Sequence, residues 1–219
     1  MRMLVRLLCC LCLVAGAAAQ QPRARIDGPG VKVGDTWMYN TLNGWTGDLD
    51  YVSVNTVKEI SKQGIILESA SLDRSSVSTI RRTRDFNLIS VEAPHFTQRA
   101  LPYYPNFVFP LEVGKTWKRD VELVNSREPD KEVRAKLEGK VVGWERVTVP
   151  AGTFRALKIV VTGYYHGTNN EGSWSGRIED ALWYAPEVRN AVRYEYTDTV
   201  GVDRYNRDVH ELVRYWLLP

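Results

Sequence analysis

The sequence predicts an all-β protein, built as an antiparallel curved sheet, open barrel or sandwich of about ten strands with few or no helices. Short runs of alternating apolar and polar residues recur at roughly 8–12-residue spacing, which is the pattern of half-buried strands. Glycine, proline and asparagine separate these runs, as they do at tight turns. No segment beyond the N-terminal leader has the periodicity of an amphipathic helix.

Residues 1–19 have the features of a cleaved signal peptide. Arg2 and Arg6 give a positive start, and the apolar run 7–14 is too short to span a membrane, which takes about 20 apolar residues. The three alanines at 17–19 then offer a cleavage site. We therefore expect an exported protein whose mature chain has no transmembrane segment.

All three cysteines lie in this leader, at positions 9, 10 and 12. None follows the small residues that precede a lipid-modified cysteine, so we expect a periplasmic or secreted product rather than a lipoprotein. The mature chain would hold no disulfide and no thiolate site. Residues 20–219 are expected to form a single antiparallel β domain, because a chain of this size buries roughly 70% of its unfolded surface.

The charge of the mature chain is nearly balanced. Loss of Arg2 and Arg6 with the leader lowers the formal net charge from +3 to about +1, which does not favour binding to nucleic acid. The seven tryptophans and eleven tyrosines suit packing in a sheet, and they also suit a binding groove.

The first half of the chain predicts a meander that ends in a proline-rich segment. A slip of the apolar phase between Val54 and Val57 predicts a β-bulge in the second strand. Three prolines within 101–110 predict an extended aromatic connector that is neither a helix nor a central strand. The expected strands begin at Thr36 and then cover 51–60, 65–69, 75–84 and 86–92.

The second half contains the clearest turn. Pro150-Ala151-Gly152 joins two β-rich runs, and proline followed by glycine favours a tight hairpin with positive φ at Gly152. Gly143-Trp144 is expected to break the phase of the preceding strand, and residues 166–176 are expected to form a mobile loop. The expected strands cover 115–124, 133–141, 153–161, 177–184, 192–197 and 207–217.

A short motif occurs twice. Val-Gly-x-Thr-Trp stands at 33–37 and again at 113–117, each time where a strand is predicted to begin. A glycine-permitted turn followed by a tryptophan would seal one end of the core. The repetition predicts that the chain consists of two related halves, residues 33–110 and 113–219.

Several motifs resemble, in their order, a pattern of a broad group of uncharacterised secreted bacterial β proteins. They are Phe-Pro-Leu at 109–111, Val-Gly-Lys-Thr-Trp at 113–117, Val-Pro-Ala-Gly-Thr-Phe at 149–154, Trp-Tyr-Ala-Pro at 183–186 and Val-Arg-Tyr-Glu at 192–195. The resemblance covers residues 107–197 and implies a periplasmic or outer-envelope setting. It also implies a distant likeness to lipoprotein-localisation carriers, whose curved sheet holds acyl chains. Such proteins often have glycine where this chain has Arg189 and Asn190.

Aromatic residues of the connector and of two loops are the candidate ligand-binding residues. Pockets in β-barrels open at loop ends and are lined by apolar and aromatic groups with a few polar ones. The alternative is that these side chains cap the core. The candidates are Trp45, Tyr103, Tyr104, Phe107, Phe109 and Trp174.

Arg81, Arg82 and Arg84 form the one local basic cluster of the sequence. A solvated strand face explains such a cluster. The functional alternative is a basic rim that contacts anionic head groups or acidic polysaccharide.

No catalytic or metal-binding pattern is evident. The segment 172–176 has tryptophan where a nucleophile elbow has serine, and the three histidines lack metal-ligand spacing. Glu179 and Asp180 are adjacent in a predicted strand, so they are expected to point to opposite faces, which disfavours a shared acid/base pair. We therefore expect no enzyme, no metal and no cofactor.

The sequence favours an exported, non-enzymatic β protein that binds a lipid or other small ligand in the periplasm or cell envelope. The first alternative is a structural or assembly factor that contacts an envelope protein partner. A less favoured alternative is a glycan or lipid hydrolase built from dispersed carboxylates. An interior cavity would favour ligand binding, whereas a filled core with a flat aromatic patch would favour the assembly factor.

Overall fold

The computed structural model describes residues 25–72, 76–200 and 204–219. The predicted signal peptide and its cysteines lie outside the described residues. The described part of the chain contains no helix that is long and apolar enough to cross a membrane.

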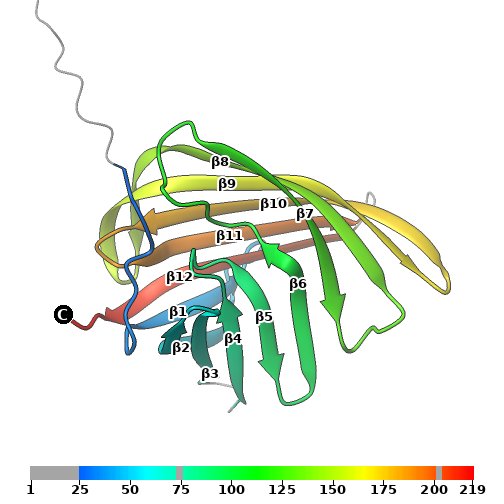
Figure 1. The fold of residues 1–219 in the computed structure, drawn as a ribbon, viewed down its shortest axis with the longest axis horizontal. Coiled ribbons are helices and arrows are strands. Elements are labelled where there is room, and N and C mark those ends of the chain that lie inside the picture. The colour runs from blue at the N-terminus through cyan, green and yellow to red at the C-terminus, as the bar shows by residue number, and fades with distance from the viewer. Residues whose placement is uncertain (1–24, 73–75, 201–203) are drawn as a thin grey trace, which may run out of the picture.

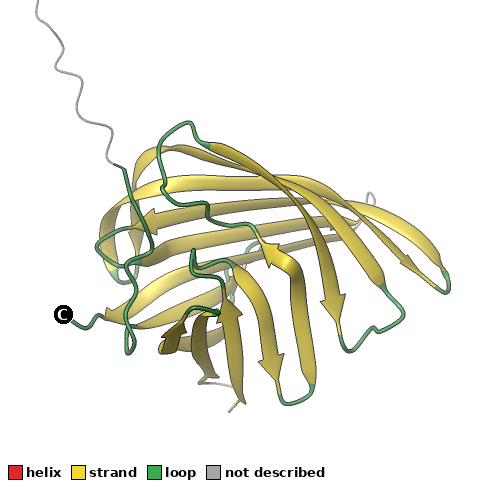
Figure 2. Ribbon diagram, viewed as in Figure 1, coloured by secondary structure: helices red, strands yellow, loops and turns green. Residues whose placement is uncertain are grey.

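Every regular element of the described chain is a β-strand, as Figure 2 shows. The first six are β1 (Thr36–Asn43), β2 (Leu49–Ser61), β3 (Gly64–Ser71), β4 (Ser76–Arg82), β5 (Leu88–Ala93) and β6 (Phe96–Tyr104). The second six are β7 (Thr116–Asn125), β8 (Glu132–Val149), β9 (Gly152–Asn169), β10 (Gly172–Ala185), β11 (Asn190–Val200) and β12 (Arg204–Trp216). The prediction of an all-β, antiparallel fold is confirmed.

The strands form a closed barrel in which each strand pairs with its neighbours in sequence (Figure 1). The last strand returns to the first, with Thr36 opposite Trp216 and Asn43 opposite Asp208. The expectation of about ten strands in an open barrel or sandwich is therefore wrong: the described residues form twelve strands, and the sheet closes. Closure removes the unpaired edges through which an exported sheet would aggregate.

The strand missed by the sequence analysis is β6, which contains part of the proline-rich connector. Pro102 lies in an irregular stretch between two register points, where Arg99 pairs with Ser90 and Tyr104 pairs with Leu88. On its other side β6 pairs with β7 through Gln98 to Leu101 alone. The prolines thus shorten the ladder on both sides without removing the strand from the barrel.

The prediction of a loop at 166–176 is also wrong, because β9 and β10 extend across this segment as one long hairpin. Only residues 170 and 171 separate the two strands. The Asn169 side chain accepts hydrogen bonds from the backbone N–H groups of Glu171 and Gly172, and Gly172 has a φ of 151°. The glycine and asparagine of this segment therefore make a tight turn.

The structure contains the predicted hairpin at Pro150 and register shifts at or near the two predicted phase breaks. Val149 pairs with Gly152, whose φ is 134°. The register of β8 shifts between Val141 and Gly143, as Gly143-Trp144 predicts. The bulge of β2 lies between Val57 and Glu59, slightly beyond the predicted position.

The two Val-Gly-x-Thr-Trp motifs have the same local geometry. Gly34 and Gly114 have φ values of 93° and 91°. Their N–H groups donate to the carbonyl oxygens of Val57 at 2.8 Å and Val141 at 2.9 Å, the residues after which the partner strands shift register. The wider relationship between the two halves stays a prediction.

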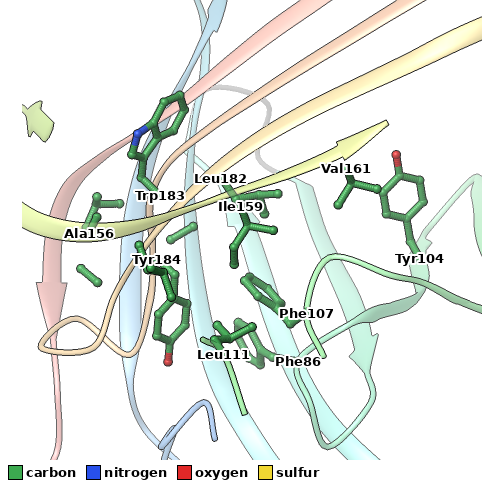
Figure 3. Close-up of a cluster of buried hydrophobic side chains, with 14 of the residues drawn as sticks. Phe86, Tyr104, Phe107, Leu111, Ala156, Ile159, Val161, Leu182, Trp183 and Tyr184 are labelled. Atoms are coloured by element: carbon green, nitrogen blue, oxygen red, sulfur yellow. The ribbon is translucent and has the colours of Figure 1, made fainter. Parts of the chain in front are cut away.

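Buried aromatic and aliphatic side chains fill one end of the barrel, which we call the closed end. Figure 3 shows Phe86, Phe107, Leu111 and Tyr184 gathered there, and each is at most 2% exposed. The rings of Phe107 and Tyr184 meet edge to face at 5.7 Å between centroids. This packing leaves the interior available only toward the opposite end.

Candidate functional site

The barrel encloses a cavity of about 1100 Å³ between the closed end and the opposite end. Its lining residues at the opposite end stand where strands finish or begin, at Ser71, Ser76, Ala93 and Phe96, and in the exposed β5–β6 turn. We call this end the mouth. Toward the closed end the cavity is bounded by Phe86 and Phe107 and by strands on both sides of the barrel.

Small polar side chains cover the wall formed by β2, β3 and β4. They stand in two cross-strand rows, Ser53–Ser71–Ser76 and Asn55–Ser69–Ser78, in which neighbours are directly paired. The next row, of Leu67, Ile80 and Val91, is apolar. This wall therefore offers both hydroxyl groups and apolar surface to a ligand.

The opposite wall carries tyrosines. The Tyr104 hydroxyl donates to Asp180 Oδ2 at 2.6 Å, and the Tyr194 hydroxyl donates to Asp180 Oδ1 at 3.1 Å. Both tyrosines line the cavity, whereas Asp180 is fully buried behind them. Burial raises the pKa of Asp180 from 3.8 to about 7, although the two hydrogen bonds favour its ionised form.

His210 belongs to the same wall and is held as a neutral ring. Its imidazole stacks on Tyr194 with 5.4 Å between ring centroids, and Nδ1 lies 2.9 Å from the Thr41 hydroxyl. Burial lowers the pKa of His210 to about 4, so the ring carries no charge at neutral pH.

Arg82 brings a permanent charge into the cavity. It is the last residue of β4 and lies toward the closed end, with its guanidinium 4.7 Å from the centre of the Phe86 ring. Nη1 donates to the Phe86 carbonyl at 2.9 Å. Burial lowers the pKa of Arg82 to about 10, so the group remains protonated at neutral pH.

Four buried side-chain atoms of the described residues have no hydrogen-bond partner, and all belong to residues that line the cavity. They are Asn55 Oδ1, Ser71 Oγ, Arg82 Nε and Asn106 Oδ1. Leaving a buried polar atom unpaired costs about 1–3 kcal/mol. All four atoms thus belong to polar side chains at the cavity wall.

Two of the six aromatic candidates line the cavity, namely Tyr104 and Phe107. Phe109 stacks on Phe107 at the closed end, with 5.9 Å between ring centroids. Tyr103 accepts a hydrogen bond from Arg119 Nη2 at 2.6 Å. Phe109 therefore supports the core, and Tyr103 supports the barrel wall.

The remaining two aromatic candidates lie apart from the cavity lining. Trp45 is 59% exposed in the β1–β2 turn, with the Arg207 guanidinium 5.7 Å from its ring centre. Trp174 lies on the β9–β10 hairpin directly over Gly167, where a Cβ atom would come within 2.2 Å of the indole. Four of the six candidates therefore lie outside the cavity lining.

The basic cluster divides between the two faces of the sheet. Arg81 is exposed and pairs with Glu92 at 2.9 Å, and the exposed Arg84 donates to the Ser61 carbonyl at 3.3 Å. Arg82 alone lines the cavity. Within the described ranges, no group of three or more histidine, cysteine or acidic side chains could hold a metal ion.

The comparisons with known proteins find a likeness of fold. No protein-family model matches the sequence, and no curated protein is significantly similar to it. The structure is similar to that of a Bacteroides fragilis protein described as exported and as having a YmcC-like fold. The two chains are 16% identical with a TM-score of 0.52, over 89% of this chain and 100% of the other.

Two further structures are more distant. A protein of Parabacteroides distasonis described as a lipoprotein is 13% identical, with a TM-score of 0.49 over 90% of this chain and 100% of that one. The lipoprotein YmcC of Escherichia coli is 12% identical, with a TM-score of 0.44 over 84% of this chain and 86% of that one.

The sequence analysis missed the serine rows and the inward direction of Arg82. A signal for the serines exists in the sequence, because serine recurs at every second position in 69–71 and 76–78. In a strand this spacing places the serines on one face. Which face is inward becomes clear only when the barrel closes.

Proposed function

We propose that this protein binds a small amphiphilic ligand inside its barrel and that it does so without catalysis, as an exported protein of the cell envelope. The observation that carries the proposal is the cavity of about 1100 Å³, which reaches the surface at the mouth. Ligand pockets usually have volumes of roughly 300–1,000 Å³ and combine apolar walls with a few polar groups. The apolar row, the serine rows and the tyrosine wall provide this combination.

Exposed apolar side chains stand at the end of the barrel where the cavity opens. Trp45, Leu49, Leu72 and Val77 are each more than 50% exposed, and all four lie in or beside the β1–β2 and β3–β4 turns. These exposed apolar side chains can contact the apolar part of an amphiphile as it enters the barrel, which lowers the free energy of entry relative to an opening surrounded only by water.

The proposal of binding rather than catalysis rests on the position of Asp180. Both oxygens of this carboxyl accept hydrogen bonds from tyrosine hydroxyls, and the residue is not part of the cavity lining. A general acid or base must come within hydrogen-bond reach of its substrate. The envelope location is supported by the likeness of fold to the exported Bacteroides fragilis protein.

A cavity-filling variant tests the proposal. Ser69→Trp combined with Ser78→Trp places two indoles on directly paired inward positions of β3 and β4. We expect delipidated wild-type protein to enhance the fluorescence of the neutral probe N-phenyl-1-naphthylamine saturably, and the filled variant to lose at least tenfold in affinity.

The matched control is Glu68→Trp combined with Thr79→Trp, which are paired on the same two strands but face outward. This control should bind the probe like the wild type. Equal binding by the filled variant, or no saturable binding by the wild type, would overturn the proposal.

A further inference from the structure

The charged side chains that line the cavity are all of one sign. Among the described residues that line it are three arginines, Arg82, Arg99 and Arg127, and none is an aspartate, glutamate or lysine. Arg99 and Arg127 are exposed near the mouth, whereas Arg82 lies inside. An interior with this charge distribution attracts anions and repels cations.

Arg82 has no counter-ion among the described residues. The groups that act on its pKa by charge are the hydroxyls of Tyr39 and Tyr194, and no carboxylate is among them. These hydroxyls are protonated at neutral pH, because burial raises the pKa of each well above its ordinary value. Arg82 is half-buried, and a half-buried guanidinium without a counter-ion favours an anionic partner.

The guanidinium also has unused hydrogen-bond capacity. Nη1 donates to the Phe86 carbonyl, while Nε is buried without a partner. The nearby Tyr39 hydroxyl does not compete for an anion, since it donates to the Ala191 carbonyl at 2.6 Å. A planar guanidinium pairs well with the oxygens of a carboxylate or phosphate.

We infer that the ligand is an anionic amphiphile whose carboxylate or phosphate head group binds Arg82 inside the barrel, while its apolar part lies along the Leu67–Ile80–Val91 row. This inference rests on the proposed function and specifies the ligand class. It assigns Arg82, rather than an exposed basic rim, as the residue that recognises the head group.

The test compares three ligands with the same fourteen-carbon chain: tetradecanoate, monotetradecyl phosphate and the neutral tetradecanol. Affinities are measured by displacement of N-phenyl-1-naphthylamine from the delipidated protein, below the critical micelle concentrations of the two anions and below the solubility limit of tetradecanol. At least one of the two anions should bind wild-type protein ten times more tightly than tetradecanol does. A preference for the carboxylate or for the phosphate would identify the type of head group.

Arg82→Gln should remove this preference by lowering the affinity for the preferred anion at least tenfold relative to the affinity for tetradecanol. The matched control is Arg81→Gln, one residue away on the outer face, which should keep the preference. Arg82→Lys keeps the charge without the planar fork and should keep part of the preference, which guards against a folding defect in Arg82→Gln.

Equal binding of the anions and tetradecanol by wild-type protein would overturn this inference and leave the proposed function standing. A preference that survives in Arg82→Gln would also overturn it. Failure of all three ligands to displace the probe would overturn it too, and failure of the probe itself to bind would overturn the proposed function as well.

Discussion

Gly152, the first residue of β9 after the two-residue turn from β8, has a φ of 134°. A Cβ atom here would meet no clash, since its nearest neighbour is 3.9 Å away in the Phe154 ring. The cost of Gly152→Val therefore comes from the backbone conformation and should be about 1–3 kcal/mol of unfolding free energy. Urea unfolding measures this change in unfolding free energy. An unchanged unfolding free energy would contradict the positive φ assigned to Gly152.

Gly143 provides the matched control. It also lies in β8, its φ is outside the positive range, and nothing lies within 4 Å of a built Cβ. Gly143→Val should change the unfolding free energy by less than about 0.5 kcal/mol.

Asp180 gives the protein a pH-dependent stability. Its pKa is raised from 3.8 to about 7 by burial, so between these values the folded state binds more protons at this carboxyl than the unfolded chain does. The contribution of Asp180 is fully present below pH 4 and is lost as the pH rises toward 7. It amounts to up to about 4 kcal/mol.

Asp180→Asn should remove this dependence. Urea unfolding at pH 4.5 and 7.5 should show that the stability of the wild type relative to the variant falls as the pH rises. Asp198 and Asp208 also have raised pKa values through burial, but they are present in both proteins and cancel in the difference. Parallel pH profiles for the two proteins would contradict the account.

At the residue scale, sequence reasoning predicted conformations better than environments. The positive φ of Gly152 and the opposite faces of Glu179 and Asp180 follow from local chemistry alone. Strand alternation places Arg81 and Arg82 on opposite faces of the sheet. Which of the two arginines points into the barrel depends on which face of the sheet closes inward. That choice is made by long-range pairing.

At the scale of elements, hydrogen bonds of Asp35 connect three segments at the closed end. Its buried carboxylate accepts hydrogen bonds from Arg189 Nη1 at 3.0 and 3.1 Å, from the Leu218 N–H at 2.9 Å and from the Lys32 N–H at 2.8 Å. Arg189 has a φ of 58° in the turn between β10 and β11, where the resembling group often has glycine. The ion pair helps to hold this turn.

Asp35→Ala should destabilise the protein by about 3 kcal/mol, because it leaves the guanidinium and two N–H groups without their acceptor. Thermal and urea unfolding measure the loss. The control is Glu138→Gln, which removes the exposed pair with Lys118 and should cost less than about 1 kcal/mol. A cost for Asp35→Ala no larger than that of the control would refute the role of the carboxylate.

At the element scale, every strand except β6 was predicted, and strand lengths were not. Pro102 and the glycines of 166–176 are locally typical of a connector and a loop, yet both segments belong to strands. In β6 an irregular register accommodates the proline, and in the β9–β10 hairpin Trp174 packs over Gly167 and covers the exposed backbone. Tertiary pairing overrode the local preference in each case.

At the scale of the whole molecule, closure of the sheet produces both the stability and the site. The pairing of β1 with β12 places Tyr39, Tyr194 and His210 around the same interior as the serine rows of β2 to β4. No stretch of sequence contains these groups together, so the site could not be read from a local motif. The all-β pattern and the aromatic content suggested an interior that holds a small ligand, and ligand binding stays a prediction.

The measurement that tests the central claim most directly is native mass spectrometry of the mature protein purified gently from an exported fraction, with lipid extraction in parallel. The account predicts a reproducible added mass that resolves to an anionic amphiphile and that is absent from the variant carrying Ser69→Trp and Ser78→Trp. An unliganded mass that stays unchanged when envelope lipid extract is added would contradict the account and favour a role in assembly with a protein partner.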